Sequence, residues 1–345
     1  MEGKKKKIVA FGELLLRLAP RGVGRFVQAD DFEARYTGAE ANAAVSLVNF
    51  GMEAYAVSKV PDNEIGQACI NYLSRFRVNT DFIARGGERL GLFYLETGAA
   101  QRASKIIYDR SHSAIRESKP EDYDWETICS GKDWFHFSGT APALGENVQR
   151  VLEDGLSAAK KHGLTVSCDL NYRAKLWSPQ EANRVMSRLM RYVDVLVGNE
   201  EDSEKVFGIK PEGSDAAHGR LAGESYKQVA EQLARRFHFA HVATTLRESV
   251  SASVNGWAGL LYDGAAHYLS RKYELNPVVD RVGGGDSFTG GLIYGLLSGF
   301  DGQHCVDFAA AASCLQHSIV GDFNLVSVRE VEALMGGDAS GRVQR

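Results

Sequence analysis

The stretch Val278-Val-Asp-Arg-Val-Gly-Gly-Gly-Asp-Ser-Phe-Thr-Gly-Gly-Leu-Ile-Tyr294 contains three consecutive glycines followed directly by an acidic residue. Gly283 to Gly285 carry no side chains, and the apolar residues Phe288, Leu292 and Leu296 follow them at helical spacing. Backbone N–H groups at such a turn and at the N-terminus of a helix can converge on an anion, and the helix dipole favours negative charge there. The stretch therefore predicts an anion-binding turn between a strand and a helix.

Asp286 follows the glycines, where a carboxylate could accept a proton from a hydroxyl group that attacks a phosphorus atom. The simpler alternative is structural, because glycine-rich turns are common and an Asp at a helix start is more often an N-cap. Taken alone, this stretch favours the simpler alternative.

A second glycine-bearing stretch, Thr37-Gly-Ala-Glu-Ala-Asn-Ala-Ala-Val-Ser-Leu-Val-Asn-Phe-Gly51, places small residues at the head of a predicted helix. Small residues there, including Gly38, let a polar ligand approach the backbone. Asn42 can both donate hydrogen bonds to sugar hydroxyls and accept them. A tight helix crossing explains this segment equally well.

Composition excludes several classes of protein. The 345 residues include 40 Lys and Arg against 44 Asp and Glu, a formal net charge of -4, so no overall charge attracts nucleic acid or an anionic membrane. Gly12, Glu13 and Arg17 interrupt the apolar run after Lys4 to Lys7, and we expect neither a secretory signal nor a membrane span. The 5 scattered cysteines indicate a reducing compartment, and we expect a cytoplasmic protein.

Short β-rich runs alternate with longer segments of helical periodicity, which is typical of βαβ units around a mostly parallel sheet. The clearest helix follows Asn147 and ends at Gly163. The runs predicted as strands are Ile8 to Phe11, Trp134 to Phe137, Thr165 to Cys168 and Val193 to Gly198. Further helices are expected to begin near Ala41, Ile65, Gln180, Tyr226, Asp286, Cys305 and Val328.

Residues 13–36 and 90–110 break this alternation, and the second segment contains the strand-like runs LFYLE and KIIYDR. We interpret both as excursions that build a small β-sheet lid beside one α/β domain spanning residues 1–335. A small sheet has exposed edges, so it would pair with another copy or close over a ligand. Lys210 to Glu224 is predicted to be a surface loop, and residues 336–345 a disordered tail.

The two glycine-bearing stretches together resemble the paired motifs of the PfkB, or ribokinase-like, carbohydrate kinases. The early motif is G-x-x-x-N, and the late one is D-x-x-G-x-G-D from Asp280 to Asp286. The resemblance covers about Ile8 to Met335. Within that family, four runs resemble the bacterial 2-keto-3-deoxygluconate kinases: Asp169-Leu-Asn-Tyr-Arg173, Gly198-Asn-Glu-Glu-Asp202, Thr245-Leu-Arg-Glu-Ser249 and Gly321-Asp-Phe-Asn324.

The resemblance implies a three-layer α/β/α fold with a mostly parallel central sheet and a β lid. It also implies an ATP-dependent kinase that uses Mg²⁺, with K⁺ as a further cation left open. Asp286 would be the catalytic base and the amides of Gly283, Gly284 and Gly285 the anion hole. The implied sugar site comprises Gly38, Asn42, Phe93, Tyr108, Arg110, Asn171, Arg173 and Asp286. The implied nucleotide site comprises Asn199, Thr245, Arg247, Gly283 and Gly285.

The resemblance further implies that Asn199 and Asp202 hold Mg²⁺ through water, in an N-x-x-E pattern where this chain has Asp in place of Glu. The run His241 to Thr245 and the helix from Ala309 to His317 would line the nucleotide site, although a core strand and a core helix fit their composition equally well. A second departure lies in the lid, where relatives carry Tyr after Gly-Leu and this chain has Phe93 followed by Tyr94. The hydrogen bond of that Tyr would be missing here or supplied by Tyr94.

Arg110 and Arg173 carry the information about the substrate. Arg173 follows a predicted strand, at the edge where open α/β sheets bind ligands, and Arg110 ends a lid strand with Tyr108 on the same face. Two guanidinium groups suit a carboxylate, because each can form charge-assisted, bidentate hydrogen bonds. Most arginines are solvated surface charges, and the resemblance around both positions is what selects these two.

The leading hypothesis is phosphorylation of the terminal (C6) hydroxyl of 2-keto-3-deoxygluconate by ATP, in a homodimer or higher oligomer formed through the lid. The alternatives are a kinase for a neutral sugar such as fructose or ribose, and a sugar-binding regulator without catalysis. A dinucleotide-dependent dehydrogenase would need G-x-G-x-x-G after the first strand, and a P-loop kinase would need G-x-x-x-x-G-K-[ST]. The chain has neither motif, and its 9 histidines show no metal-ligand spacing.

Overall fold

The computed structural model describes residues 5–199, 201–210 and 223–337. Most of the predicted loop from Lys210 to Glu224, and residues 338–345 of the predicted tail, lie outside the described residues. Within these ranges, no helix is both long enough and apolar enough to cross a membrane.

The main sheet is mostly parallel, as the alternating pattern predicted. All neighbours from β5 to β11 are parallel, and antiparallel pairs occur only at the β12 end. In spatial order the strands are β13 (His267–Leu269), β12 (Asn255–Tyr262), β11 (His241–Ser249), β10 (Val195–Asn199), β9 (Thr165–Asp169), β8 (Trp134–Ser138), β1 (Lys7–Phe11), β4 (Glu53–Val60) and β5 (Asn79–Arg85), with β14 (Tyr273–Leu275) also paired to β12.

Helices cover both faces of this sheet because its strands are apolar on both faces. In β1, Val9 and Phe11 pack into one core cluster, whereas Ile8 and Ala10 face the opposite side. One face is covered by α3 (Trp125–Cys129), α4 (Glu146–Lys161), α5 (Pro179–Leu189), α6 (Asp202–Phe207) and α7 (Gly223–Phe237). The other is covered by α1 (Ala39–Asn49), α2 (Glu64–Arg75), α8 (Gly284–Leu297), α9 (Gly302–Gln316) and α10 (Val328–Met335).

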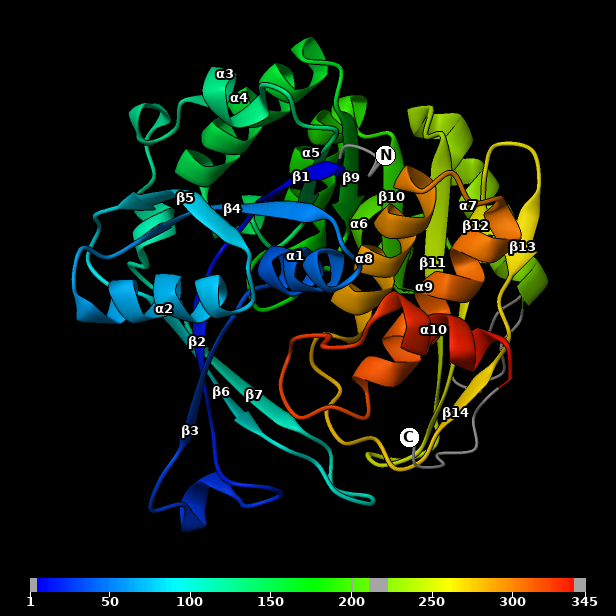
Figure 1. Ribbon diagram of the computed structural model, residues 1–345, viewed down its shortest axis with the longest axis horizontal. Coiled ribbons are helices and arrows are strands. Elements are labelled where there is room, and N and C mark those ends of the chain that lie inside the picture. The colour runs from blue at the N-terminus through cyan, green and yellow to red at the C-terminus, as the bar shows by residue number, and fades with distance from the viewer. Residues whose placement is uncertain (1–4, 200, 211–222, 338–345) are drawn as a thin grey trace.

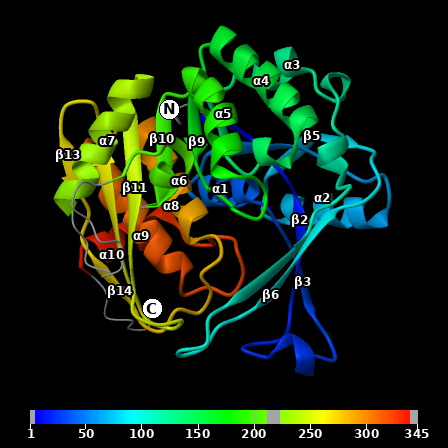
Figure 2. The same cartoon turned by 180° about the vertical axis from the view of Figure 1, so that it is seen from behind.

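A separate four-stranded sheet forms from the two predicted excursions, and we call it the lid sheet. Its order is β3 (Glu33–Thr37), β2 (Leu15–Ala19), β6 (Gly91–Glu96) and β7 (Lys105–Asp109). The lid sheet projects from one side of the three-layer body, as Figures 1 and 2 show from opposite directions. Its apolar residues Leu15, Ala19, Phe93 and Leu95 form a small core cluster of their own.

Helix α8 lies unusually close to α1 and α9 because it contains glycines at the two crossings. A Cβ atom on Gly290 would lie 2.7 Å from the Ser46 Cβ, and one on Gly291 would lie 2.9 Å from the Ala309 Cα. These close contacts fix the position of α8, and therefore where its N-terminus meets the carboxyl ends of the parallel strands. In open α/β sheets, ligands bind at this edge.

Candidate active site

One cavity of about 590 Å³ lies between the lid sheet and the carboxyl ends of the main-sheet strands. The predicted site residues that line it are Gly38, Asn42, Phe93, Tyr108, Arg110, Asn171, Arg173, Asn199, Asp202, Thr245, Arg247, Gly283, Gly285 and Asp286. Gly284 does not line it, because a Cβ there would lie 2.4 Å from the His317 ring. The fold thus brings residues from both sheets and from α1 and α8 around one space.

Asp286 faces this cavity from the first turn of α8 and does not cap the helix. The N-cap is Gly283, and the Asp286 Oδ2 accepts a hydrogen bond from the Asn42 Nδ2 at 2.6 Å. Burial raises the pKa of Asp286 to about 7, even though the Asn42 hydrogen bond favours the charged form. The carboxylate is therefore suited to accept a proton near neutral pH, and the simple N-cap interpretation is wrong.

The three glycines, which we call the glycine turn (Gly283 to Gly285), present backbone rather than side chains to the cavity. Gly283 has φ +89°, and a Cβ there would lie 2.1 Å from the Asp322 carbonyl oxygen, so only glycine fits. A Cβ on Gly285 would have no neighbour within 4 Å, because it faces open space. The amides of the first turn of α8, a 14-residue helix, are thus accessible to an anion.

Three carboxylates line the cavity close to one another. Asp169, at the end of β9, lines the cavity together with Asp202 and Asp286. Burial, with the nearby Asp202 and Asp286 charges, raises the pKa of Asp169 to about 8. A cation between these groups would favour their ionised forms, because a nearby opposite charge lowers the pKa of a carboxyl group.

Asn199 and Asp202 hold each other in place at the end of β10. The Asn199 Oδ1 accepts a hydrogen bond from the Asp202 amide at 3.0 Å, and the Asp202 Oδ2 accepts one from the Asn199 amide at 3.0 Å. The Asp202 Oδ1 also accepts one from the Tyr172 amide at 3.2 Å. Both residues line the cavity, and the Asp202 carboxylate has acceptor capacity left for the water shell of a Mg²⁺ ion, which prefers oxygen ligands.

Arg110 and Arg173 line the same cavity from opposite sides, one from the lid and one from the body. Arg110 lies over the Tyr108 ring at 4.3 Å, and its Nε is 3.5 Å from the Glu13 Oε2. Arg173 donates to the Tyr172 carbonyl at 3.0 Å. Both guanidinium groups are thus preorganised beside the cavity.

The Tyr94 alternative is wrong. Phe93 is 4% exposed and lines the cavity, whereas Tyr94 lies on the opposite face of β6 and contacts Phe32 with ring centroids 6.3 Å apart. Successive side chains of a strand point to opposite faces, so Tyr94 cannot replace a hydroxyl at position 93. Tyr108 packs beside Phe93 at 6.0 Å.

The predicted nucleotide residues are only partly brought together. Thr245 and Arg247, on β11, line the cavity, and Arg247 lies 5.4 Å from the centre of the Trp257 ring. The α9 residues Ala309 to Ala312 are fully buried in the core and do not line it.

Several polar residues line the cavity without belonging to the predicted site. Glu13 is buried and accepts a hydrogen bond from the Ser113 hydroxyl at 2.7 Å, beside Arg110. Lys175 donates from its Nζ to the Ile106 carbonyl at 2.9 Å and so joins the body to the lid sheet. For Asp169 a signal existed, since it opens the run that ends at Arg173. Glu13 offered only its position inside an otherwise apolar run.

The model of the pfkB family carbohydrate kinases matches residues 5–322 of this chain. The chain therefore belongs to the PfkB family of carbohydrate kinases.

Individual relatives are similar over nearly their full lengths. The crystal structure of 2-dehydro-3-deoxygluconokinase from Thermotoga maritima has 51% sequence identity and a TM-score of 0.93, and the match covers 97% of this chain and 99% of that chain. The 2-dehydro-3-deoxygalactonokinase of Haloferax volcanii is 32% identical, over 96% of this chain and 98% of its own length. The 2-dehydro-3-deoxygluconokinase of Thermoproteus tenax is 27% identical, over 95% and 94% respectively.

Proposed function

We propose that this protein phosphorylates the C6 hydroxyl of 2-keto-3-deoxygluconate, also named 2-dehydro-3-deoxygluconate, with ATP as the donor. The product is 2-keto-3-deoxy-6-phosphogluconate. One observation carries the proposal: a partly buried carboxylate at the head of α8, Asp286, shares a cavity with two guanidinium groups, Arg110 and Arg173. The Asp286 carboxylate suits the activation of a hydroxyl, and the two guanidinium groups suit the recognition of a carboxylate. The names of the relatives support the same activity.

Asp286 is proposed as the general base. Its carboxylate accepts the proton of the C6 hydroxyl as that oxygen attacks the γ-phosphorus of ATP, and ADP leaves. The Asn42 amide, which donates to the Asp286 Oδ2 at 2.6 Å, keeps the other carboxylate oxygen directed toward the substrate hydroxyl. Asn42 and Gly38 would also contact the sugar.

The amides of the glycine turn are proposed to bind the phosphoryl group during transfer. Charge develops on its equatorial oxygens, and backbone N–H groups at a helix N-terminus stabilise that charge without reorganisation. Of these residues, Gly283 and Gly285 border the cavity, whereas the role of Gly284 is to let the turn pack against His317.

The sugar acid is proposed to bind between the lid and the body, with its carboxylate toward Arg110 and Arg173. Tyr108 stacks on Arg110, Phe93 covers the carbon chain, and Asn171 offers an amide to a hydroxyl. Because Glu13 already compensates part of the Arg110 charge at 3.5 Å, we assign the larger share of carboxylate binding to Arg173.

The nucleotide is proposed to bind beside Thr245 and Arg247, with Mg²⁺ held through water by Asn199 and Asp202 and balanced by Asp169. When bound, Mg²⁺ neutralises charge on the transferring phosphate. K⁺ remains a candidate cofactor, so assays should contain it. The free thiols of all five cysteines agree with a cytoplasmic location.

We also propose a homodimer formed through the lid sheet. Its edge strands are β3 and β7, and among the exposed large apolar residues Val23, Val27, Phe32 and Ile107 all lie in the two lid excursions. Open strand edges with apolar side chains are stabilised by pairing with another copy.

The deciding experiment is a coupled ADP-release assay with 2-keto-3-deoxygluconate, its galactonate epimer, fructose and ribose. The proposed function predicts turnover of a sugar acid, a neutral-sugar kinase predicts turnover of fructose or ribose, and a regulator predicts binding without ADP release. Both sugar acids are included because the relatives carry both names.

Arg173→Ala tests the carboxylate role within the same assay. Removing one partner of a buried charge pair costs on the order of 2 to 5 kcal/mol, so kcat/KM for the sugar acid should fall at least about 20-fold. For fructose the loss should be far smaller. The ratio of the two values cancels general damage, and an unchanged ratio would exclude this role.

A further inference from the structure

Arg17 is a buried cation that the transfer chemistry described above does not use. It lies at the centre of β2, on the same face as Leu15 and Ala19, which are both buried. Only 4% of its side chain is exposed. A guanidinium group keeps its charge in proteins, so it is stable in such a place only with anionic partners.

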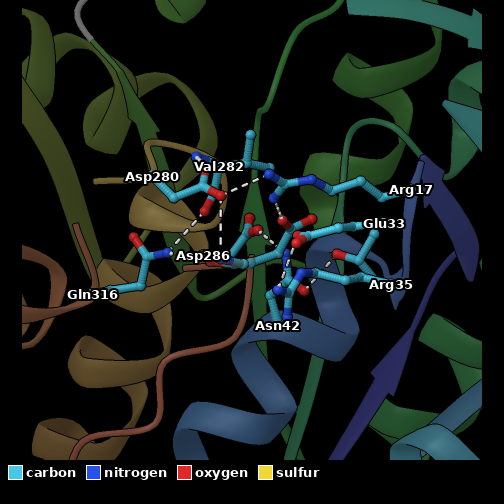
Figure 3. Close-up of polar contacts among 11 residues, drawn as sticks. Arg17, Glu33, Arg35, Asn42, Asp280, Val282, Asp286 and Gln316 are labelled. Carbon is cyan, nitrogen blue, oxygen red and sulfur yellow. Dashed lines mark hydrogen bonds and ion pairs between the residues drawn. The ribbon is translucent and has the colours of Figure 1, made fainter. Parts of the chain in front are cut away.

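Two carboxylates supply that charge, and both come from the body rather than the lid. Figure 3 shows one of them, Asp280, beside Arg17. The Arg17 Nη2 donates to the Asp280 Oδ2 at 2.7 Å, and the Nη1 donates to the Asp322 Oδ1. These partners are 263 and 305 residues away in the chain. Although burial alone would lower it, the Asp322 and Asp280 carboxylates raise the pKa of Arg17.

Asp280 links Arg17 to the segment that precedes the glycine turn. Its Oδ1 accepts a hydrogen bond from the Val282 amide at 3.1 Å, and its Oδ2 accepts one from the Gly321 amide at 3.1 Å. Gln316 completes the arrangement, because its Nε2 donates to the Val282 carbonyl at 2.8 Å and to the Gly321 carbonyl at 3.1 Å. The residue that precedes Gly283 is therefore held at both its amide and its carbonyl.

Asp322 makes a second connection. Its carbonyl oxygen lies 2.1 Å from where a Gly283 Cβ would be, so the backbones of the two segments are in direct contact. Its carboxylate lies close to Thr37, whose hydroxyl donates its one proton to the Asn42 Oδ1 at 2.8 Å. Since Asn42 in turn donates to Asp286, Thr37 and Asn42 connect the proposed base to the surroundings of Asp322.

Arg17 also balances charge. Without it, Asp280 and Asp322 would be two buried carboxylates with no guanidinium between them, a costly arrangement. Relief would require protonation or separation of the two groups, and separation would move the glycine turn away from α9.

We propose that Arg17 is a positioning residue that, from the lid sheet, sets the glycine turn and the Asn42–Asp286 pair in their transfer geometry. It does not touch the substrate and acts through Asp280 and Asp322. The inference rests on the proposed kinase function and adds that the lid takes part in phosphoryl transfer as well as in sugar binding.

Arg17→Ala tests the proposal, with Arg21→Ala as the matched control. Arg21 belongs to the same lid excursion but pairs with Asp31 at 2.8 Å on the surface. Removing a residue that orients catalytic groups typically costs about 10-fold to 100-fold. We expect kcat of Arg17→Ala to fall by that factor while KM for the sugar acid changes less than about threefold. Arg21→Ala should match the wild type.

Chemical rescue separates positioning from general stability. About 20 mM guanidinium chloride is far below the molar range that unfolds proteins. In Arg17→Ala it should occupy the space between the two carboxylates and restore kcat at least fivefold, with saturation. The same concentration of sodium chloride should restore nothing, and neither salt should change the wild type or Arg21→Ala.

Arg17→Lys tests the positioning role of Arg17 if Arg17→Ala does not fold. Lysine keeps the charge but cannot contact both carboxylates with a planar fork, so we expect a near-normal melting temperature with reduced kcat. Wild-type kcat in a folded Arg17→Ala or in Arg17→Lys would overturn the proposal, as would a loss in Arg17→Ala that guanidinium fails to restore. If the wild type uses a neutral sugar instead, the proposed substrate fails, but the Arg17 comparison still holds with that acceptor.

Discussion

At the scale of single residues, Asp286 is costly to the fold and useful to the reaction. It is partly buried, and this burial raises its pKa from the ordinary value of 3.8 to about 7. Because the native state binds this proton more tightly than the unfolded state does, ionisation destabilises the protein as the pH rises through about 4 to 7. Such conflicts between stability and function are typical of active sites.

Asp286→Asn should therefore lose activity without losing stability. The amide is nearly isosteric, and its oxygen can still accept the hydrogen bond from Asn42. We expect kcat to fall about 10²-fold to 10⁴-fold, the usual contribution of a general base. Calorimetry at pH 8 should show a melting temperature equal to or above that of the wild type. A variant with near wild-type kcat would exclude Asp286 as the base.

Asn42 should set the pH dependence. The base acts only when ionised, so kcat/KM should rise with pH and level off above about 7. Asn42→Ala removes a hydrogen bond that favours the charged form. Such bonds are worth about 1.5–3 kcal/mol, so the rising limb of the kcat/KM profile should move about one to two pH units higher. Ser46→Ala, one turn along α1, leaves the Asn42 amide in place and should not shift the pH profile. An unshifted limb in Asn42→Ala would contradict this coupling.

At the scale of elements, the glycine turn should separate stability from activity. Gly283→Ala adds a Cβ 2.1 Å from the Asp322 carbonyl at φ +89°, so we expect a large loss of stability, on the order of 2 kcal/mol or more. Gly285→Ala adds a methyl group to open cavity, so the fold should stay intact while kcat falls. Denaturant unfolding and ADP release measure the two effects. Equal stability losses in both variants would argue against the turn geometry described here.

The elements also differ in how well sequence predicts them. The strands β1, β8, β9 and β10 are apolar runs between helices with clear periodicity, and their prediction is confirmed. β12 was not predicted, because its glycines, Gly256 and Gly259, obscure the β-rich pattern. Gly259 is needed for packing, since a Cβ there would lie 2.5 Å from the Phe288 ring. This requirement arises from packing against a distant segment, so nothing in the sequence around β12 indicates it.

The residues of the site also differ in how well the sequence predicts their roles. Asp286, Asn42 and the glycines lie in compact motifs, so their meeting could be predicted. Arg17 could not be assigned, because it meets Asp280 only after 263 residues of chain have folded. In the sequence it was merely a charge that interrupted an apolar run. Its partner Asp280 belongs to the motif, but nothing in a motif names the cation that binds it.

At the scale of the whole molecule, the lid sheet should hold two copies together. Ile107, which is 54% exposed, lies on the edge strand β7. Ile107→Lys should convert the dimer to a monomer in light scattering at micromolar protein, because it places like charges at the paired edges. Leu269→Lys, at a 50% exposed position on β13 of the body, should leave the mass unchanged. A wild type with a monomer mass would exclude the dimer.

Division of labour between the two sheets has a consequence for how such kinases diversify. The lid supplies Phe93, Tyr108 and Arg110 to the acceptor site, whereas the body supplies Arg173 together with the base and the main-chain amides. Main-chain amides do not depend on the identity of the side chains. Substitutions in β6 and β7 can therefore change the preferred acceptor while the transfer chemistry stays the same. The exception is β2, where Arg17 ties the lid to the glycine turn. A chimera built to change the acceptor should therefore exchange β6 and β7 and retain the native β2.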